Sequence, residues 1–184
     1  MIARNLIGAV ALTSVAFAAG AAGFSVRSPT VKPGTKLTDL HVYKGFGCDG
    51  KNESPALNWS GAPAGTKSYA VTVYDPDAPT GSGWWHWVVY NIPASVTSLA
   101  AGAGAEGGKA LPAGAQMGRT DFGTAAFGGA CPPPGSAPHR YIFAVHALKV
   151  EKIEVPADAS AALVGFNLSA NRIGEAKIWA TYNR

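Results

Sequence analysis

The chain has 184 residues, a length typical of one domain, and carries 15 lysines and arginines against 11 aspartates and glutamates. The net charge of +4 is small and the basic residues are scattered, which excludes a nucleic-acid surface built from clustered lysine and arginine. A chain of this length buries enough surface on folding to form a real core.

The first residues have the layout of a secretory signal peptide. Arg4 precedes a run of apolar or small residues at 6–17, and the triplets at 16–18 and 19–21 both offer small-x-small cleavage sites. The alternative is an N-terminal membrane anchor, but the run is shorter than the roughly 20 residues that a span requires. We therefore expect cleavage, and no stable membrane span afterwards.

Cleavage would define the folded part of the chain and its compartment. We expect the signal peptide to be residues 1–21, with a boundary between 18 and 23, and residues 22–184 to form a single domain. Such a protein is periplasmic or secreted. In an oxidising compartment the two cysteines, Cys48 and Cys131, most simply form a disulfide. Two free thiols or a metal site are the alternatives, but no histidine pattern near the cysteines gives zinc-binding spacing.

Stretches rich in β-branched and aromatic residues recur along the chain and predict strands. The expected strands lie at 24–27, 38–43, 56–60, 69–74, 86–92, 115–120, 141–150 and 176–182. One helix is expected from Ala159 to about Asn171, with Asp158 as its N-cap and with Leu163 and Phe166 on one apolar face. The sum is an all-β domain with one short C-terminal helix.

The stretch 68–91 organises this domain. Its two strands are apolar on both alternate faces, which indicates central strands that are covered on both sides. Two prolines that follow Asp75 closely cannot sit in a central ladder, so the first strand must end at Asp75. If the two strands pair antiparallel, Asp75 and His86 emerge at the same rim of the sheet and share one concave corner with Trp84 and Trp85.

A third segment adds candidate site residues. Histidine, arginine and tyrosine at 139–141 open the next strong strand. If this strand pairs antiparallel with the strand at 69–74, its start lies beside Asp75. An aspartate, two histidines and a tyrosine would then converge, which suits a small anion, because imidazolium and phenol donate hydrogen bonds while the carboxylate orients the imidazole. Backbone amides at 129–131 would add donors.

The same residues also allow an enzymatic interpretation. Asp75 and Asp77 with two histidines resemble the donor set of a metal site or a phosphoesterase. Against this, the sequence contains no Gly-x-Ser-x-Gly, HExxH or P-loop motif. Turn formation is the simpler role for either aspartate alone, and core packing is the simpler role for Trp84, Trp85 and Trp87.

Three separated motifs point to a known family. In order, they are Asp75-Pro76-Asp77-Ala78-Pro79, Trp84-Trp85-His86-Trp87, and the run from Pro132-Pro133-Pro134-Gly135 to His139-Arg140-Tyr141. They resemble the phosphatidylethanolamine-binding protein family, and the Gly-Ser-Gly-Trp-Trp-His-Trp string resembles its bacterial, Raf-kinase-inhibitor-like branch. The resemblance covers the chain from about Phe24 to the C-terminus.

The resemblance implies two antiparallel sheets in a Greek-key arrangement, with a small anion pocket at one end. The implied ligand-binding residues are Asp75, Pro79, Trp84, His86, Cys131, His139 and Tyr141. Trp84 would form a pocket wall, Pro79 would follow a cis peptide, and the backbone near Cys131 would contact the anion. The family often has glycine where Cys131 stands, and a long C-terminal helix over the pocket is not evident here.

We therefore expect an exported, non-enzymatic binding protein for a small anionic or phosphate-bearing ligand, without cofactor or metal. A metal-dependent or metal-independent hydrolase that uses Asp75 with His86 or His139 is the runner-up. A protein-interaction module of the kinase-inhibitor type, with a protein partner, is the third hypothesis. An exported bacterial protein meets no cytosolic kinase of its own cell, so the inhibitor label is treated as a family name.

Overall fold

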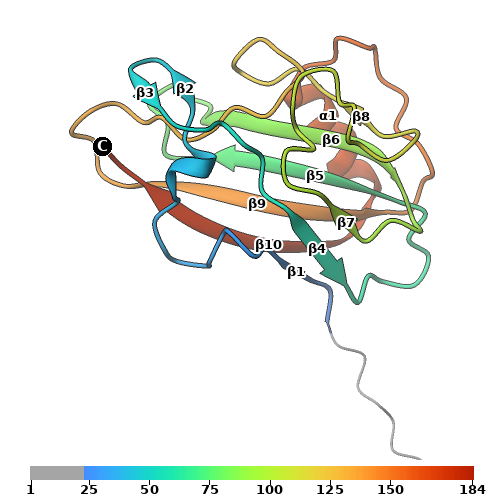
Figure 1. Cartoon of the computed structure of the whole chain (residues 1–184). Helices are drawn as coiled ribbons and strands as arrows, with labels where there is room; N and C mark the ends of the chain where they lie inside the picture. The colour runs from blue at the N-terminus through green and yellow to red at the C-terminus, as the bar shows by residue number, and fades with distance from the viewer. Residues whose placement is uncertain (1–22) are drawn as a thin grey trace, which may run out of the picture.

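A five-stranded antiparallel sheet forms the centre of the molecule (Figure 1). The computed structural model describes residues 23–184, so the expected signal peptide at 1–21 lies outside the described residues. In sheet order, the strands are β10 (Arg172–Tyr182), β9 (His139–Leu148), β5 (Ser68–Asp75), β6 (Trp84–Pro93) and β8 (Gln116–Met117). Mostly antiparallel sheets with a single α-helix in the described part of the chain confirm the expected fold class.

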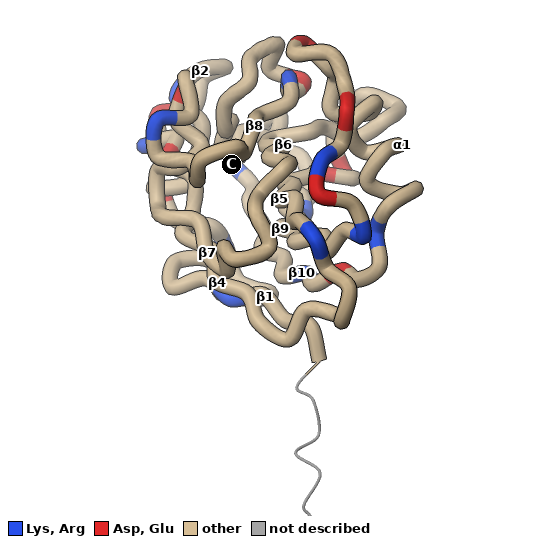
Figure 2. Tube along the Cα trace, turned by 90° about the vertical axis from the view of Figure 1, so that its right-hand side faces the viewer, with Lys and Arg blue, Asp and Glu red and all other residues tan. Residues whose placement is uncertain are grey.

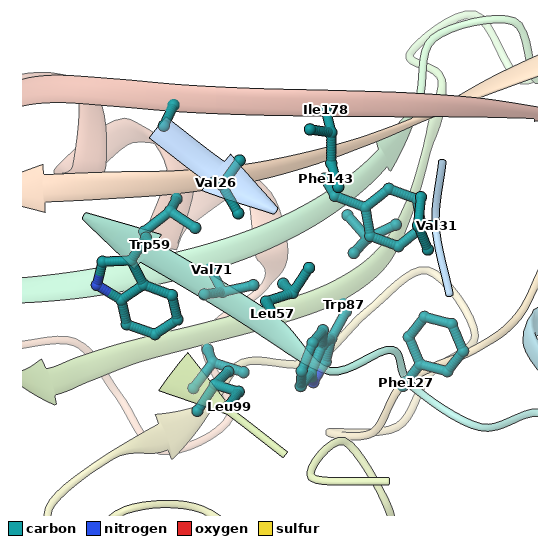
Figure 3. Packing of buried hydrophobic residues seen from close by; sticks show 14 of the residues in the cluster. Val26, Val31, Leu57, Trp59, Val71, Trp87, Leu99, Phe127, Phe143 and Ile178 are labelled. Carbon is teal, nitrogen blue, oxygen red and sulfur yellow. The ribbon is translucent and has the colours of Figure 1, made fainter. Parts of the chain in front are cut away.

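A smaller, three-stranded sheet packs on one face of the central sheet. Its strands are β1 (Ser25–Arg27), β4 (Leu57–Ser60) and β7 (Ser98–Leu99). Figure 3 shows Val26 and Trp59 of this sheet in the same buried cluster as Val71 and Phe143 of the central sheet. This cluster is the main core. A two-stranded hairpin, β2 (Lys44–Gly45) and β3 (Cys48–Asp49), completes the strands.

Strand β5 is buried on both faces, as its nearly continuous apolar sequence predicts. Val71 and Val73 join the main core. On the opposite face, Ala70 packs in a second cluster with Val164 and Leu168 of α1 (Ala161–Asn171). The strand is therefore fixed from both sides, and its end at Asp75 is a rigid base for a site.

The helix differs from the expectation in its start and in the face that it buries. Ser160, not Asp158, is the N-cap, and its hydroxyl accepts a hydrogen bond from the amide of Leu163 at 3.2 Å. Leu163 and Phe166 are 39% and 73% exposed, because the helix packs on the sheet through its smaller Ala161 and Val164 side and through Leu168. The expected apolar face is therefore wrong.

The segment 38–43 was expected as a strand and forms a 3₁₀ helix, η1 (Asp39–His41), instead. The ring of His41 is buried, and both of its nitrogens are bonded, to the carbonyl of Glu53 at 2.7 Å and to the hydroxyl of Thr30 at 2.9 Å. These hydrogen bonds stabilise the 3₁₀ turn, where the sequence pattern predicts strand pairing. His41 is thus a structural residue.

Charged residues are interspersed on the side of the molecule that Figure 2 shows, where lysine or arginine alternates with aspartate or glutamate along the trace. That view matches the scattered charge of the sequence. Among residues 23–184, no helix has both the length and the apolar character that crossing a membrane would require.

Candidate functional site

Three strand ends meet at one rim of the central sheet. Asp75, the last residue of β5, pairs with Trp84, the first residue of β6. Tyr74 pairs with Ile142 on the other side, which places the start of β9 beside Asp75. Because β5 is antiparallel to both neighbours, its C-terminal end meets the N-terminal ends of β6 and β9. The expected pairing of the three segments is therefore confirmed.

A cavity of about 200 Å³ opens at this rim. All seven residues proposed from the sequence line it: Asp75, Pro79, Trp84, His86, Cys131, His139 and Tyr141. Six further residues line the cavity and were not among the expected site residues: Phe46, Ala78, Thr80, Phe122, Pro132 and Pro133. Ala78, Pro132 and Pro133 belong to the motifs that carry the family resemblance, whereas Phe46 lies outside them and its signal is that of a lone aromatic between two glycines.

His86 reaches the cavity through a β-bulge. Val73 pairs with Trp87 and Tyr74 pairs with Trp85, so that His86 is the extra residue of β6. A bulge interrupts the alternation of side chains and re-aims one of them. Here it turns the imidazole toward the main-core face of the sheet, where the cavity lies. The strand pattern at 86–92 does not predict this bulge.

The ring of His86 is 3% exposed and is bonded on one side only. Its Nδ1 donates to the carbonyl of Gly128 at 2.7 Å, while its Nε2 is buried without a partner among residues 23–184. Burial lowers the pKa of His86 to about 4 and outweighs the Gly128 carbonyl and the carboxylate of Asp75, which both raise it. The ring is therefore neutral near pH 7.

The second histidine of the cavity is held by a carboxylate. Nδ1 of His139 donates to Oδ2 of Asp75 at 2.7 Å, and both side chains are buried. Oδ1 of Asp75 accepts the amide of Asp77 at 2.8 Å. Both oxygens of Asp75 are thus engaged inside the protein, so Asp75 acts through His139, whose Nε2 edge remains for the cavity.

Tyr141 and two further aromatic residues form the walls. The ring of Tyr141 lies edge-on to His86, with centroids 5.1 Å apart, and Phe122 lies edge-on to both His86 and Trp84 at 5.4 Å. Burial, followed by the negative charge of Asp75, raises the pKa of the Tyr141 phenol above its usual range. Its hydroxyl therefore stays protonated and can donate a hydrogen bond.

Asp77 and Arg140 do not line this cavity. They form a two-point ion pair, with Nη2 to Oδ1 at 2.7 Å and Nε to Oδ2 at 2.8 Å. The Arg140 hydrogen bond lowers the pKa of Asp77 to about 2. The carboxylates of Asp75 and Asp77 therefore serve different partners. Within the part of the chain that the structure describes, no group of three acidic, histidine or cysteine side chains could hold a metal ion.

Trp85 is also separated from the cavity, contrary to the expectation of a shared corner with Trp84. It packs against Tyr74, with centroids 4.5 Å apart, and lies near Gly165 of α1 on the opposite face of the sheet. Its amide donates to Oδ2 of Asp121 at 2.7 Å. Trp85 is therefore a packing residue beneath the helix.

The expected disulfide between Cys48 and Cys131 is confirmed, with a Cα–Cα distance of 6.0 Å. It ties the β2–β3 hairpin to a cavity wall, and it closes a long loop, which restricts the unfolded chain. Arg184 reinforces this tether by donating to the carbonyls of Pro132, Gly47 and Phe46 at 2.7, 3.0 and 3.1 Å. Phe46, 66% exposed, is thereby held at the edge of the cavity.

One finer expectation is wrong and another is narrowed. No peptide bond between residues 23 and 184 is cis, including the one before Pro79. The turn closes instead through the carboxylate of Asp75 and through a hydrogen bond from the amide of Thr80 to the carbonyl of Ala78 at 2.8 Å. Second, the amides of Gly129 and Ala130 donate to Oδ1 of Asn52 and to the carbonyl of His41, so of the three expected amide donors only that of Cys131 remains a candidate for an anion.

The chain matches a family model and has similar relatives. The model described as phosphatidylethanolamine-binding protein matches residues 27–183. The UPF0098 protein YbcL of Escherichia coli is 58% identical over 179 residues, which cover 97% of this chain and 98% of that protein. The UPF0098 protein YbhB of the same organism is 52% identical over 156 residues, covering 85% and 98%.

Solved structures of similar proteins have the same fold as this chain. The crystal structure of E. coli YbcL, which is described as a member of the mammalian PEBP family, superposes with a TM-score of 0.87 at 60% identity, covering 89% of this chain and 99% of that one. CT736 of Chlamydia trachomatis gives 0.72 at 26% identity, covering 88% and 98%. Sequence, fold and the order of the three motifs lead to one conclusion: the chain belongs to the phosphatidylethanolamine-binding protein family.

Proposed function

We propose that the chain is an exported, non-enzymatic binding protein whose cavity takes a small phosphate-bearing ligand. The Asp75–His139 pair carries this proposal, because the buried carboxylate 2.7 Å from Nδ1 orients the imidazole with its Nε2 edge toward the cavity, where it can meet an anion. The Tyr141 hydroxyl supplies a second donor in the same cavity.

The size of the cavity supports a small ligand. Its volume of about 200 Å³ is below the roughly 300–1,000 Å³ of pockets for drug-sized molecules. The aromatic walls, Trp84 and Phe122, would contact the carbon atoms next to the phosphate, while Phe46 at the edge would contact parts of the ligand that extend outward. The family name is consistent with a phosphorylated head group.

Export is part of the proposal and is supported by two features. The sequence begins with a signal-peptide layout at 1–21, and a disulfide joins Cys48 to Cys131. Structural disulfides persist in oxidising compartments such as the periplasm. A mass measurement of the processed protein, expected to begin between residues 18 and 23, tests this part directly.

The binding experiment is calorimetric titration of the oxidised protein with phosphoethanolamine and with ethanolamine. We expect binding of the first compound only. His139→Asn is the informative variant, because an asparagine amide reaches the Nδ1 position and preserves the bond to Asp75 but has no atom at Nε2. We expect it to weaken binding by tenfold or more, while Asp77→Asn, outside the cavity, binds as wild type. Undiminished binding by His139→Asn would refute the proposed site.

A hydrolase is the second candidate, and one observation favours it. Neutral His86 has a free Nε2 that could accept a proton from an attacking water. Turnover of aryl phosphate or carboxyl esters by the wild type, lost in His86→Asn, would establish this activity. Absence of turnover at high protein concentration would leave the binding proposal alone.

A further inference from the structure

The tautomer of His86 decides whether this ring offers the cavity a hydrogen-bond donor or a hydrogen-bond acceptor. The carbonyl of Gly128 can only accept, so Nδ1 of His86, 2.7 Å away, must carry the hydrogen. A neutral ring then has its lone pair on Nε2. This nitrogen is buried and has no partner among residues 23–184. The cavity therefore contains a hydrogen-bond acceptor where a site for a fully deprotonated anion would need a donor.

The charged groups around His86 do not convert its Nε2 from an acceptor into a donor. Asp75 at the end of β5 and Asp121 in the loop after β8 are negative and favour an imidazolium. From β9, His139 and Tyr141 face the same cavity. The loss of hydration on burial prevails over the two carboxylates and lowers the pKa of His86 to about 4. At neutral pH, Nε2 is an acceptor.

An unpartnered acceptor discriminates between ligands. An oxygen without a hydrogen, placed against Nε2, would repel its lone pair and leave a buried polar atom unsatisfied, which costs about 1–3 kcal/mol. An oxygen that carries a hydrogen would donate to Nε2 instead. Phosphate monoesters, with a second pKa near 6, keep such a hydrogen at small cost, whereas sulfate esters and phosphodiesters have none near pH 7.

We propose that the cavity selects phosphate monoesters in their monoanionic form, with the P–OH group donating to Nε2 of His86 while Tyr141 and His139 donate to the other oxygens. This inference rests on the proposed function and narrows it. It assigns the discriminating contact to His86, and it disfavours the diester phosphate of an intact phospholipid relative to a free phosphorylated head group.

The test uses two matched ligands, phosphoethanolamine and ethanolamine O-sulfate, titrated calorimetrically at several pH values in buffers that differ in ionisation enthalpy. At pH 8, we expect phosphoethanolamine to take up close to one proton more on binding than the sulfate ester does. The difference should fall toward zero near pH 5, where the free phosphate monoester already holds its proton. At pH 7, we expect the phosphate ester to bind roughly tenfold more tightly.

His86→Asn isolates the contact. Asparagine preserves a donor to the Gly128 carbonyl and removes the acceptor at Nε2, so the preference for phosphate over sulfate should collapse to within about twofold. Tyr141→Phe should weaken both esters equally and preserve the preference. Glycerophosphoethanolamine, a diester, should bind like the sulfate ester.

The outcomes separate the two proposals. Equal affinity of the wild type for both esters, without extra proton uptake, would overturn this inference and leave the anion-binding function in place. Failure of both esters to bind would overturn the proposed function itself. If His86→Asn does not fold, the difference in proton uptake measured on the wild type decides the question alone.

Discussion

Two pairs of histidines in this fold look alike by burial and differ in their bonding. His41, His86, His139 and His146 are 1%, 3%, 4% and 6% exposed. His41 and His146 have both ring nitrogens bonded, whereas His86 and His139 use only Nδ1 among the described residues. Burial therefore does not separate the two pairs, whereas the presence of a ring nitrogen without a bond to the described protein does.

His146 shows what a structural histidine looks like on the same sheet. It lies on β9, on the face toward α1, and its Nε2 is 2.9 Å from the Thr72 hydroxyl, while its Nδ1 is 3.2 Å from Oε1 of Glu175. The hydrogen bond from His146, assisted by Lys177, lowers the pKa of Glu175 to about 2. Both ring nitrogens of His146 are thus engaged by side chains of the protein, which leaves neither free for a ligand.

The largest expected effect concerns this cluster. His146→Ala would leave the buried Thr72 hydroxyl unpartnered and remove the packing of the ring, which we expect to lower the free energy of unfolding by about 3–4 kcal/mol. Affinity for phosphoethanolamine should not change in the folded protein. Urea unfolding followed by tryptophan fluorescence measures the first quantity. A variant as stable as wild type would contradict the structural role assigned to the histidines that have both ring nitrogens bonded.

The second prediction concerns acid. The pKa of His86 is lowered from 6.5 to about 4 in the folded protein, so the stability tied to its neutral form is complete above pH 6.5 and is lost as the pH falls toward 4. The full loss is on the order of 3 kcal/mol. His86→Asn should be free of this part of the pH dependence.

Unfolding curves of wild type and His86→Asn at pH 7, 5.5 and 4 provide the measurement. The difference between the two proteins isolates His86 from other groups that titrate in the same range. Parallel profiles would mean that the pKa of His86 is not lowered in the folded protein, which would contradict the burial effect assigned to this ring.

The third prediction exchanges two hydroxyl groups. Tyr141→Phe should weaken binding roughly tenfold, the value of one hydrogen bond to a charged group, and leave the melting temperature nearly unchanged. Tyr74→Phe is the control with the opposite pattern, because the Tyr74 hydroxyl donates to the Ser82 carbonyl at 2.8 Å outside the cavity. It should cost about 1 kcal/mol of stability and no affinity. The same response in both variants would contradict the assignment.

The smallest effect is expected at the ion pair behind the cavity. Asp77 and Arg140 side chains are 30% and 54% exposed, and pairs of this kind contribute less than about 1 kcal/mol. Asp77→Asn should therefore lower stability slightly, less so in 0.5 M salt, and leave ligand affinity intact. Thermal unfolding at two salt concentrations checks this. A large loss of affinity would mean that the Asp77–Arg140 ion pair contributes to ligand binding, contrary to the site proposed here.

The sequence was sufficient to predict which strand ends meet at the cavity, but it did not predict the local backbone geometry there or the start of the helix. The end of β5 and the starts of β6 and β9 were predictable, because strong strand patterns stop at prolines or begin at polar motifs. The bulge at His86 was not, since it depends on how two strands settle against each other. Neither was the choice of Ser160 over Asp158 as helix cap, where two capping residues compete within three positions.

Long-range contacts explain the other misses. The pattern at 38–43 alternates like a strand, but the buried ring of His41 is bonded to Thr30 and Glu53, which no local window contains. Leu163 and Phe166 form an apolar stripe, but the sheet accepts the smaller side of the helix. Phe46 lies at the cavity only because its hairpin is tied down.

The bridge between Cys48 and Cys131 has a practical consequence for any measurement of affinity. One of its cysteines lines the cavity and the other lies in the neighbouring hairpin, so oxidation holds a wall of the cavity in place and also restricts the unfolded chain. Protein made in a reducing cytosol would have the identical sequence, with the hairpin retained by Arg184 and the backbone contacts alone. Two preparations could then differ in ligand affinity without a single substitution, and a thiol count belongs beside every titration.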